Sequence, residues 1–302
     1  MMKLSKKAII VPMLILSLLF LTACQKEAAQ TIRGAYLGGT SGVVPVFEAF
    51  GVEESGVYSI FDEETFPLEV TIRNKGEYEL KAGEVKVRLL GPSQEEFSGI
   101  PSWDLSNQEV IEAISELIPD GGENTFTFSS DAKYNKDVTG VIDREWFANV
   151  EYRYNTYLVV PEVCLKEDLN DDRVCDVKEA KQFSVSGAPI TVKSVEEETA
   201  GKGIVALKIK VSNAGTGKVT LPNEDFSVRN TLSYALDDPA WECKSGGKVG
   251  EARLDELGQA EIVCKLNGAL AAGHISTKQV KLTLDYKYRD LIQETLRIKQ
   301  SS

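Results

Sequence analysis

Histidine is nearly absent from this chain, since one of its 302 residues, His274, carries an imidazole. A metalloprotease motif of the H-E-x-x-H type needs two histidines, and a serine-type triad needs one beside a nucleophile. His274 follows Gly273 in a turn-like stretch, which indicates a surface residue. A glycine-rich phosphate-binding loop is also missing from the sequence. We therefore predict that the protein is not an enzyme.

Positive charge is also scarce, with 34 Lys and Arg against 46 Asp and Glu and a net charge of -12. Lys3, Lys6 and Lys7 lie in the first seven residues, which hold no acid, so the rest of the chain carries -12 - 3 = -15. Nucleic acid binding requires a cationic face, and adhesion to anionic lipid requires a basic stripe. We expect neither. The charge indicates a solvated surface that keeps copies of the protein apart.

A hydrophobic run of about fourteen mostly apolar residues begins at Ala8 and leads to Leu21-Thr22-Ala23-Cys24. A basic start, an apolar run and small residues before a cysteine are typical of a signal peptide. The final four residues resemble a lipobox, which implies cleavage before Cys24 and lipidation of its thiol. We predict a lipoprotein signal over 1–23 and a tether over 24–35. Alternatives are a secretory signal or an uncleaved membrane anchor, although a span needs about 20 residues.

Cysteine is limited to five residues. If Cys24 carries lipid, an even set of four remains, Cys164, Cys175, Cys243 and Cys264. Three pairings are possible, and we favour Cys164 with Cys175 and Cys243 with Cys264 because each pair lies within one predicted domain. A four-cysteine zinc site is the alternative, but the spacing contains no C-x-x-C pair.

Apolar and polar residues alternate in several segments, which predicts strands with one face on a core. These segments lie near 68–72, 85–89, 150–154, 205–211 and 280–288. One helix is predicted after Ser106, which forms a capping-box pattern with Glu109. Apolar residues then follow at helical spacing until Pro119 ends the segment; they are Val110, Ile111, Ile114, Leu117 and Ile118.

The two halves of the chain repeat the same landmarks. The turn Asn74-Lys75-Gly76 returns 139 positions later as Asn213-Ala214-Gly215, and Tyr152-Arg153-Tyr154 returns 134 positions later as Tyr286-Lys287-Tyr288. Landmarks in the same order at nearly constant offset indicate two copies of one all-β unit. We place the boundary after Ser186, where Gly187 and Pro189 interrupt the pattern. This gives domains over 36–186 and 187–302.

Short alternating strands with an N-x-G turn resemble the CARDB-type immunoglobulin-like modules of envelope proteins. Further stretches are similar to uncharacterised surface proteins of small-genome archaea; these are Gly38–Val43, Phe66–Val70, Asn74–Gly76 and Ser186–Ile190, with Cys164 and Cys175. The resemblance implies an all-β fold of two tandem immunoglobulin-like β-sandwich domains, the first with the inserted helix, at the cell surface. That surface is the outer face of the cytoplasmic membrane, or the periplasm or outer membrane if the source has one.

An acidic segment offers a candidate cation site. Five side chains fall at positions 1, 3, 5, 9 and 12 of a calcium loop: Asp168, Asn170, Asp172, Asp176 and Glu179. Arg173 occupies the position that needs glycine, so a solvated acidic hairpin is the favoured interpretation and no cofactor is expected.

Four aromatic side chains suggest a sugar-binding face as a second option, although aromatics in β-sandwiches usually form the core; they are Trp103, Trp146, Trp241 and Tyr157. We predict a lipid-anchored, non-catalytic binding or structural module of the cell envelope with an unknown protein or glycan partner. An accessory subunit that binds calcium or a glycan is the alternative.

Overall fold

The computed structural model describes residues 34–168, 171, 173–227 and 229–301. Strands dominate these residues, with one short 3-10 turn, η1 (Gln94–Glu96). The first strands are β1 (Val43–Phe47), β2 (Val52–Glu54), β3 (Val57–Phe61), β4 (Thr65–Asn74), β5 (Val85–Leu90), β6 (Phe97–Ser98), β7 (Asp104–Ser106), β8 (Glu123–Tyr134) and β9 (Val141–Lys166). The later strands are β10 (Glu179–Ala180), β11 (Ser184–Val185), β12 (Ile190–Gly201), β13 (Ile204–Asn213), β14 (Lys218–Thr220), β15 (Thr231–Leu236), β16 (Trp241–Ser245), β17 (Lys248–Val249), β18 (Glu251–Arg253), β19 (Gln259–Leu266) and β20 (Ile275–Lys299).

The alternating segments form strands as predicted. In β5 the side chains of Val85, Val87 and Leu89 are buried while those between them are exposed. In β13 the inward positions 205, 207, 209 and 211 are at most 1% exposed. Period-2 alternation determines which face of each strand is apolar, and burial of that face against a second sheet forms the core of a sandwich. The prediction of an all-β sandwich fold is therefore confirmed.

The order of paired strands is the same in both halves. The sheet β1-β4-β8-β6 of the first half corresponds to β12-β13-β19-β16 of the second, and β9-β5-β7 corresponds to β20-β15-β18. Equivalent turns follow β4 and β13. In one, the Tyr154 hydroxyl lies 2.9 Å from Asn74 Oδ1, and in the other the Tyr288 hydroxyl lies 2.9 Å from Asn213 Oδ1. The repeat that was read from the sequence is thus present in strand order and in side-chain hydrogen bonds.

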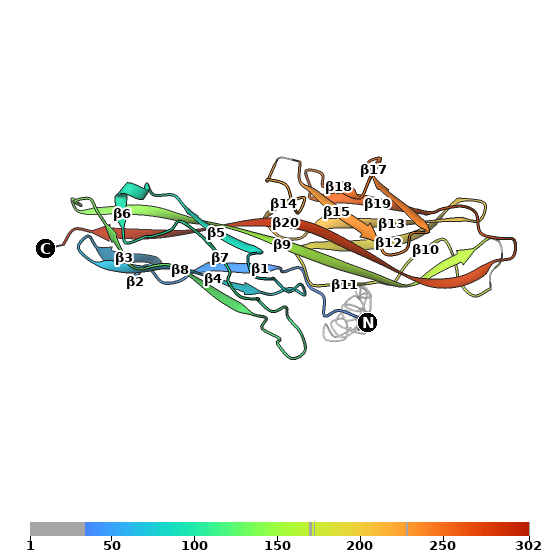
Figure 1. Ribbon diagram of the computed structural model, residues 1–302, viewed down its shortest axis with the longest axis horizontal. Coiled ribbons are helices and arrows are strands. Elements are labelled where there is room, and N and C mark those ends of the chain that lie inside the picture. The colour runs from blue at the N-terminus through green and yellow to red at the C-terminus, as the bar shows by residue number, and fades with distance from the viewer. Residues whose placement is uncertain (1–33, 169–170, 172, 228, 302) are drawn as a thin grey trace, which may run out of the picture. The chain divides into compact units, whose positions relative to one another are not determined.

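The two halves share a central ribbon of two long strands. β9 and β20 pair antiparallel from Val141 opposite Lys299 to Lys166 opposite Ile275. Figure 1 shows them side by side through both sets of strands. β20 also pairs with β15 through residues 282–285 and, in parallel, with β3 through residues 296–299, so the last strand of the second copy completes the first half. Residues 33–302 form one compact unit, and the division after Ser186 into two domains stays a prediction.

The predicted helix after Ser106 is absent, so that prediction is wrong. Residues 107–122 form an irregular loop in which the backbone of Ile111 bonds to Leu80 in both directions, at 2.8 and 3.1 Å. Ile111 is buried, but Val110, Leu117 and Ile118 are 47%, 93% and 39% exposed. Most of the apolar stripe therefore has no surface to cover, and without that burial a short helix is unstable in water.

Candidate functional site

Both predicted disulfides are present. Cys164 and Cys175 are joined with a Cα–Cα distance of 5.8 Å, and Cys243 is joined to Cys264, its direct opposite in the β16–β19 pair. Because all four sulfur atoms are in disulfides, these cysteines cannot provide the thiolates of a zinc site. Each bridge should stabilise the fold by about 3 kcal/mol, mainly by restricting the unfolded chain.

The described members of the predicted calcium loop bond to neighbouring protein groups. Asp176 Oδ1 accepts a hydrogen bond from the backbone of Lys178 at 3.0 Å, and Glu179 Oε1 lies 2.6 Å from Lys181 Nζ. Asn170 and Asp172 lie outside the described residues, and Asp168 follows β9. Among the residues that the structure describes, no group of three or more acids, histidines or cysteines could hold a metal ion. The calcium site therefore stays a prediction.

The four aromatic residues do not form one open face. Trp146 is fully buried and stacks on the partly buried Trp103 with ring centroids 5.5 Å apart. Trp241 is 6% exposed in the second half, and Tyr157 stacks on Tyr36 with centroids 6.3 Å apart. Trp146 and Trp241 are thus core residues, which is the usual place for aromatics in a sandwich.

His274 lies in the connection before β20. Its Nε2 atom is 2.8 Å from the hydroxyl of Ser276, two residues along the chain, and its side chain is exposed. An exposed imidazole with this local contact agrees with the interpretation as a surface residue.

The strongest cluster of buried charge lies between β10 and β12, and its sequence signal was missed. Lys181 Nζ lies 2.6 Å from both Glu179 Oε1 and Glu197 Oε2 and 3.2 Å from the carbonyl of Asp176. Glu197 Oε2 also accepts a hydrogen bond from the backbone of Cys164 at 3.0 Å. We call Glu179, Lys181 and Glu197 the acid–lysine clamp. It joins the end of β9, the hairpin closed by the disulfide, β10 and β12.

The position of Glu197 follows from the strand alternation of β12. The register of β12 shifts between Val192 and Ser194, and Val195 and Glu197 then both point inward. A glutamate two residues after an inward valine is the signal that could have identified the clamp from sequence. On the outer face, Glu196 and Glu198 pair with Lys210 and Lys208, as expected of a solvated strand face.

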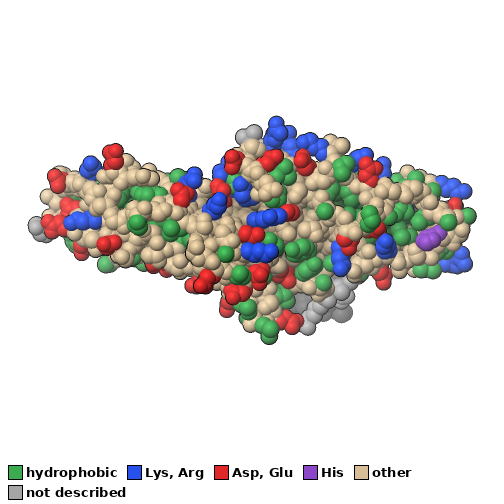
Figure 2. All heavy atoms as spheres, viewed as in Figure 1, with side chains coloured by type: hydrophobic (Ala, Val, Ile, Leu, Met, Phe, Trp, Pro, Cys, Tyr) green, Lys and Arg blue, Asp and Glu red, His purple; other side chains and the backbone are tan. Residues whose placement is uncertain are grey.

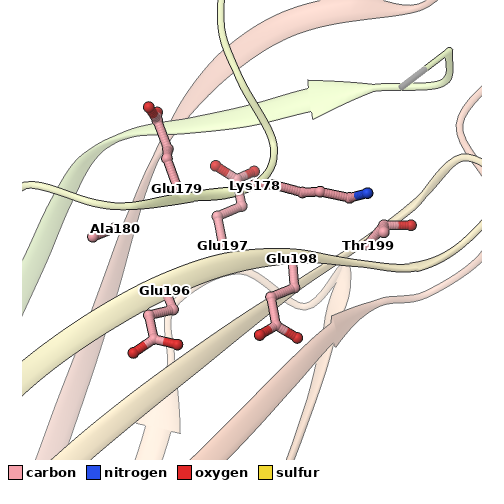
Figure 3. Close-up of a pocket in the computed structure, with 7 residues that line it drawn as sticks. All are labelled: Lys178, Glu179, Ala180, Glu196, Glu197, Glu198 and Thr199. Atoms are coloured by element: carbon pink, nitrogen blue, oxygen red, sulfur yellow. The ribbon is translucent and has the colours of Figure 1, made fainter. Parts of the chain in front are cut away.

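A shallow pocket of about 460 Å³ lies against the clamp. Its lining residues are Lys178, Glu179, Ala180, Glu196, Glu197, Glu198 and Thr199. Figure 3 shows Glu179 and Glu197 on one side of the β12 ribbon and Glu196 and Glu198 on the other. The pocket therefore follows the edge of the sheet, where the two-residue strand β10 leaves part of β12 without a neighbour.

Burial raises the pKa of Glu197 to about 7, although Lys181 and the Cys164 amide oppose the shift. A carboxyl group with this pKa suits proton transfer in principle. The side chain of Glu197 is fully buried, however, and its Oε2 atom is already bonded to Lys181 and to the backbone of Cys164. Within the described residues its Oε1 atom has no hydrogen-bond partner, so this buried oxygen is unsatisfied. The geometry fits a structural clamp better than a catalytic acid.

Comparisons with protein-family models and with curated proteins give no match for this chain. The proposed lipidation site, Cys24, and the whole predicted signal lie outside the described residues. Across the part of the chain that the structure describes, no helix has the length and apolar character needed to cross a membrane.

Proposed function

We propose that this protein is a lipid-anchored cell-surface protein that acts as a non-catalytic binding or structural module of the cell envelope. Lipid on Cys24 would hold it at the outer face of the membrane. Two disulfides support an oxidising location, because such bonds persist outside the cytoplasm.

The shared β9–β20 ribbon is the observation that carries the proposal. A pair of strands that runs through both halves leaves no single-stranded linker at which the halves could bend. Tandem domains joined by a linker move relative to each other by default, whereas continuous pairing holds two sandwiches in one orientation. A stiff body with loops displayed from its ends suits the presentation of a binding surface or the spacing of other envelope components.

Replacement of Cys24 by serine tests the anchor. Wild-type protein should incorporate labelled fatty acid and remain with membranes after an alkaline wash. Cys24→Ser should lose the label and be released from membranes, while a Ser301→Ala variant should behave as wild type. A Cys24→Ser protein that stays in the membrane in the same amount would support an uncleaved membrane anchor.

The binding role is tested by crosslinking intact cells that carry tagged protein. One partner at near-stoichiometric yield supports a binding module, and a ladder of the protein itself supports a structural role. If neither is recovered and the purified protein turns over an envelope polymer, the proposal of a non-catalytic module is wrong.

A further inference from the structure

The loop of residues 107–122, which we call the tip loop, has no counterpart of similar length in the second half. It joins β7 to β8, whereas the corresponding connection from β18 to β19 spans only residues 254–258. Figure 1 shows it projecting beyond the sheets, and Figure 2 shows hydrophobic and acidic side chains together on this projection. Its most exposed large apolar residue is Leu117, at 93%.

The tip loop is held in one conformation by its own hydrogen bonds. The backbone of Ser115 donates to the carbonyl of Ile118 at 3.1 Å, and the backbone of Ile118 donates to the hydroxyl of Ser115 at 3.0 Å. Gly122 donates to the carbonyl of Glu112 at 2.9 Å and closes the base of the loop. These bonds turn Leu117 outward, so its exposure is built into the loop.

The tip loop is hydrogen-bonded to the turn after β4. The same turn also binds the first residues of the chain that the structure describes. Ile114 donates to the carbonyl of Gly76 at 2.9 Å. The carboxylate of the next residue, Glu77, accepts hydrogen bonds from the backbones of Leu37 and Gly38 at 2.9 and 2.8 Å. Leu37 is itself 56% exposed. The base of the tip loop and the exposed Leu37 are therefore bonded to the same turn, through Gly76 and Glu77.

We propose that the tip loop rests on the membrane to which the protein is anchored, with Leu117 and Ile118 in the interfacial layer. The proposal rests on lipidation of Cys24. Nine residues, 25–33, separate that cysteine from the described chain, so the ten steps from Cys24 to residue 34 span at most about 35 Å. A lipid at that distance holds the attachment point of the tip loop near the bilayer, and side chains too few to bind a membrane alone can then insert.

The acidic side chains of the tip loop determine which lipid composition favours this contact. Glu116 precedes Leu117 and Glu112 lies at the base of the loop, while Asp120 lies 3.3 Å from Lys75. The contact is therefore apolar and gains nothing from anionic headgroups, in keeping with the net charge of the chain. Phosphatidylcholine should support it better than a mixture rich in phosphatidylglycerol, and added salt should reduce the difference.

A fluorescent probe on an introduced cysteine tests the proposal in full-length protein purified with its anchor. The other cysteines are in disulfides or carry the lipid, so Leu117→Cys provides the reactive thiol. Leu257→Cys is the matched control, because it lies in the equivalent short connection of the second half and is 78% exposed. Both proteins are reconstituted on phosphatidylcholine vesicles, and flotation first shows whether they are anchored.

In floated samples we expect quenching by aqueous iodide to fall several-fold at position 117 and to stay unchanged at position 257. The same probe on a Cys24→Ser protein should remain fully quenched, since the tip loop alone binds too weakly. Failure to float would reject the lipid anchor. Flotation with equal quenching at both positions would leave the anchor intact and overturn the tip-loop contact. If the probe at position 117 were protected from iodide on cells but not on vesicles, the contact of the tip loop with lipid would also be overturned. That result would favour contact with a protein partner.

Discussion

Glu197 and Lys181 illustrate how burial changes the chemistry of single residues. The side chain of Glu197 is fully buried and that of Lys181 is 5% exposed, and each carries hydrogen bonds that hold separate segments together. Removal of Lys181 would leave Glu197 buried without its charged partner, which costs several kcal/mol. Removal of Glu197 would leave Lys181 with Glu179 and the carbonyl of Asp176. The stability that the clamp provides therefore depends on the protonation states of Glu197 and Lys181.

The raised pKa of Glu197 predicts a dependence of stability on pH. Its pKa is about 7 in the folded protein against an ordinary value of 4.5, so the folded state binds the proton more tightly between these values. The free energy of unfolding should therefore fall as pH rises from about 4.5 to 7, by up to about 3 kcal/mol. Glu197→Gln should remove this part of the slope in urea unfolding at several pH values.

Glu196→Gln is the control, because this neighbour lies on the outer face of the same strand and pairs with Lys210 at 3.5 Å. It should keep the slope of the wild type. An unchanged slope in Glu197→Gln would show that Glu197 does not hold its proton near neutral pH.

The turn after β4 shows how one element depends on a distant side chain. Asn74 Nδ2 donates to the carbonyl of Tyr78 at 2.7 Å, and Gly76 donates its backbone N–H to Asn74 Oδ1 at 3.3 Å. The hydroxyl of Tyr154 in β9 completes the arrangement. The turn after β13 repeats these bonds with Asn213, Gly217 and Tyr288.

Removal of the tyrosine hydroxyl should weaken both turns. We expect Tyr154→Phe and Tyr288→Phe each to lower the free energy of unfolding by about 1–2 kcal/mol, since the amide oxygen of Asn74 or Asn213 loses a donor. A double-mutant cycle of Tyr154→Phe with Asn74→Ala should show coupling of at least about 0.5 kcal/mol. Strict additivity in chemical denaturation would mean that the hydroxyl and the amide act independently.

The tip loop contains both a buried apolar residue, Ile111, and an exposed one, Leu117. Ile111→Ala should destabilise the protein by about 2–5 kcal/mol, because Ile111 is 1% exposed and its loss leaves a cavity beside Leu80. Leu117→Ser should change stability by no more than about 0.5 kcal/mol. Thermal and urea unfolding measure both. Comparable losses in the two variants would indicate an amphipathic helix packed on the sheet, as the spacing had predicted.

At the scale of the whole molecule, the long strands couple the two halves. Leu296 and Ile298 belong to the second copy of the repeat, yet they are fully buried beside β3 of the first half. β9 likewise belongs to the first copy, and its residues 158–166 pair with β20 between Ile275 and Leu282. Each half is thus completed by the long strand of the other copy, β9 or β20.

This exchange predicts a single cooperative unfolding transition. Leu296→Ala should lower the free energy of unfolding by about 2–5 kcal/mol and shift the transitions of both halves together. Leu291→Ala, on the same strand and 59% exposed, is the control and should have little effect. Hydrogen exchange reports each half separately. Loss of protection in the first half alone would show that the halves unfold independently.

The sequence by itself determined the strands and the repeated landmarks, and it favoured one of three possible cysteine pairings, which the structure shows. Alternation is a local property of the chain, so Leu68–Ile72 and Val205–Val211 indicated their buried faces without knowledge of any partner. The closeness of Cys243 to Cys264 along the chain likewise agreed with their positions on neighbouring strands.

Tertiary structure decided the features that depend on residues far apart in the chain. The spacing of Ile111 and Leu117 is helical, but a helix needs a surface to cover, and only Ile111 finds one. The alternation around Tyr152 and Tyr286 predicted strands but not their mutual pairing, because the free edges of a strand carry the same backbone groups along their length. The alternation of β12 put Glu197 on the inward face, but its partner Lys181 comes from a separate hairpin that only the tertiary structure brings there.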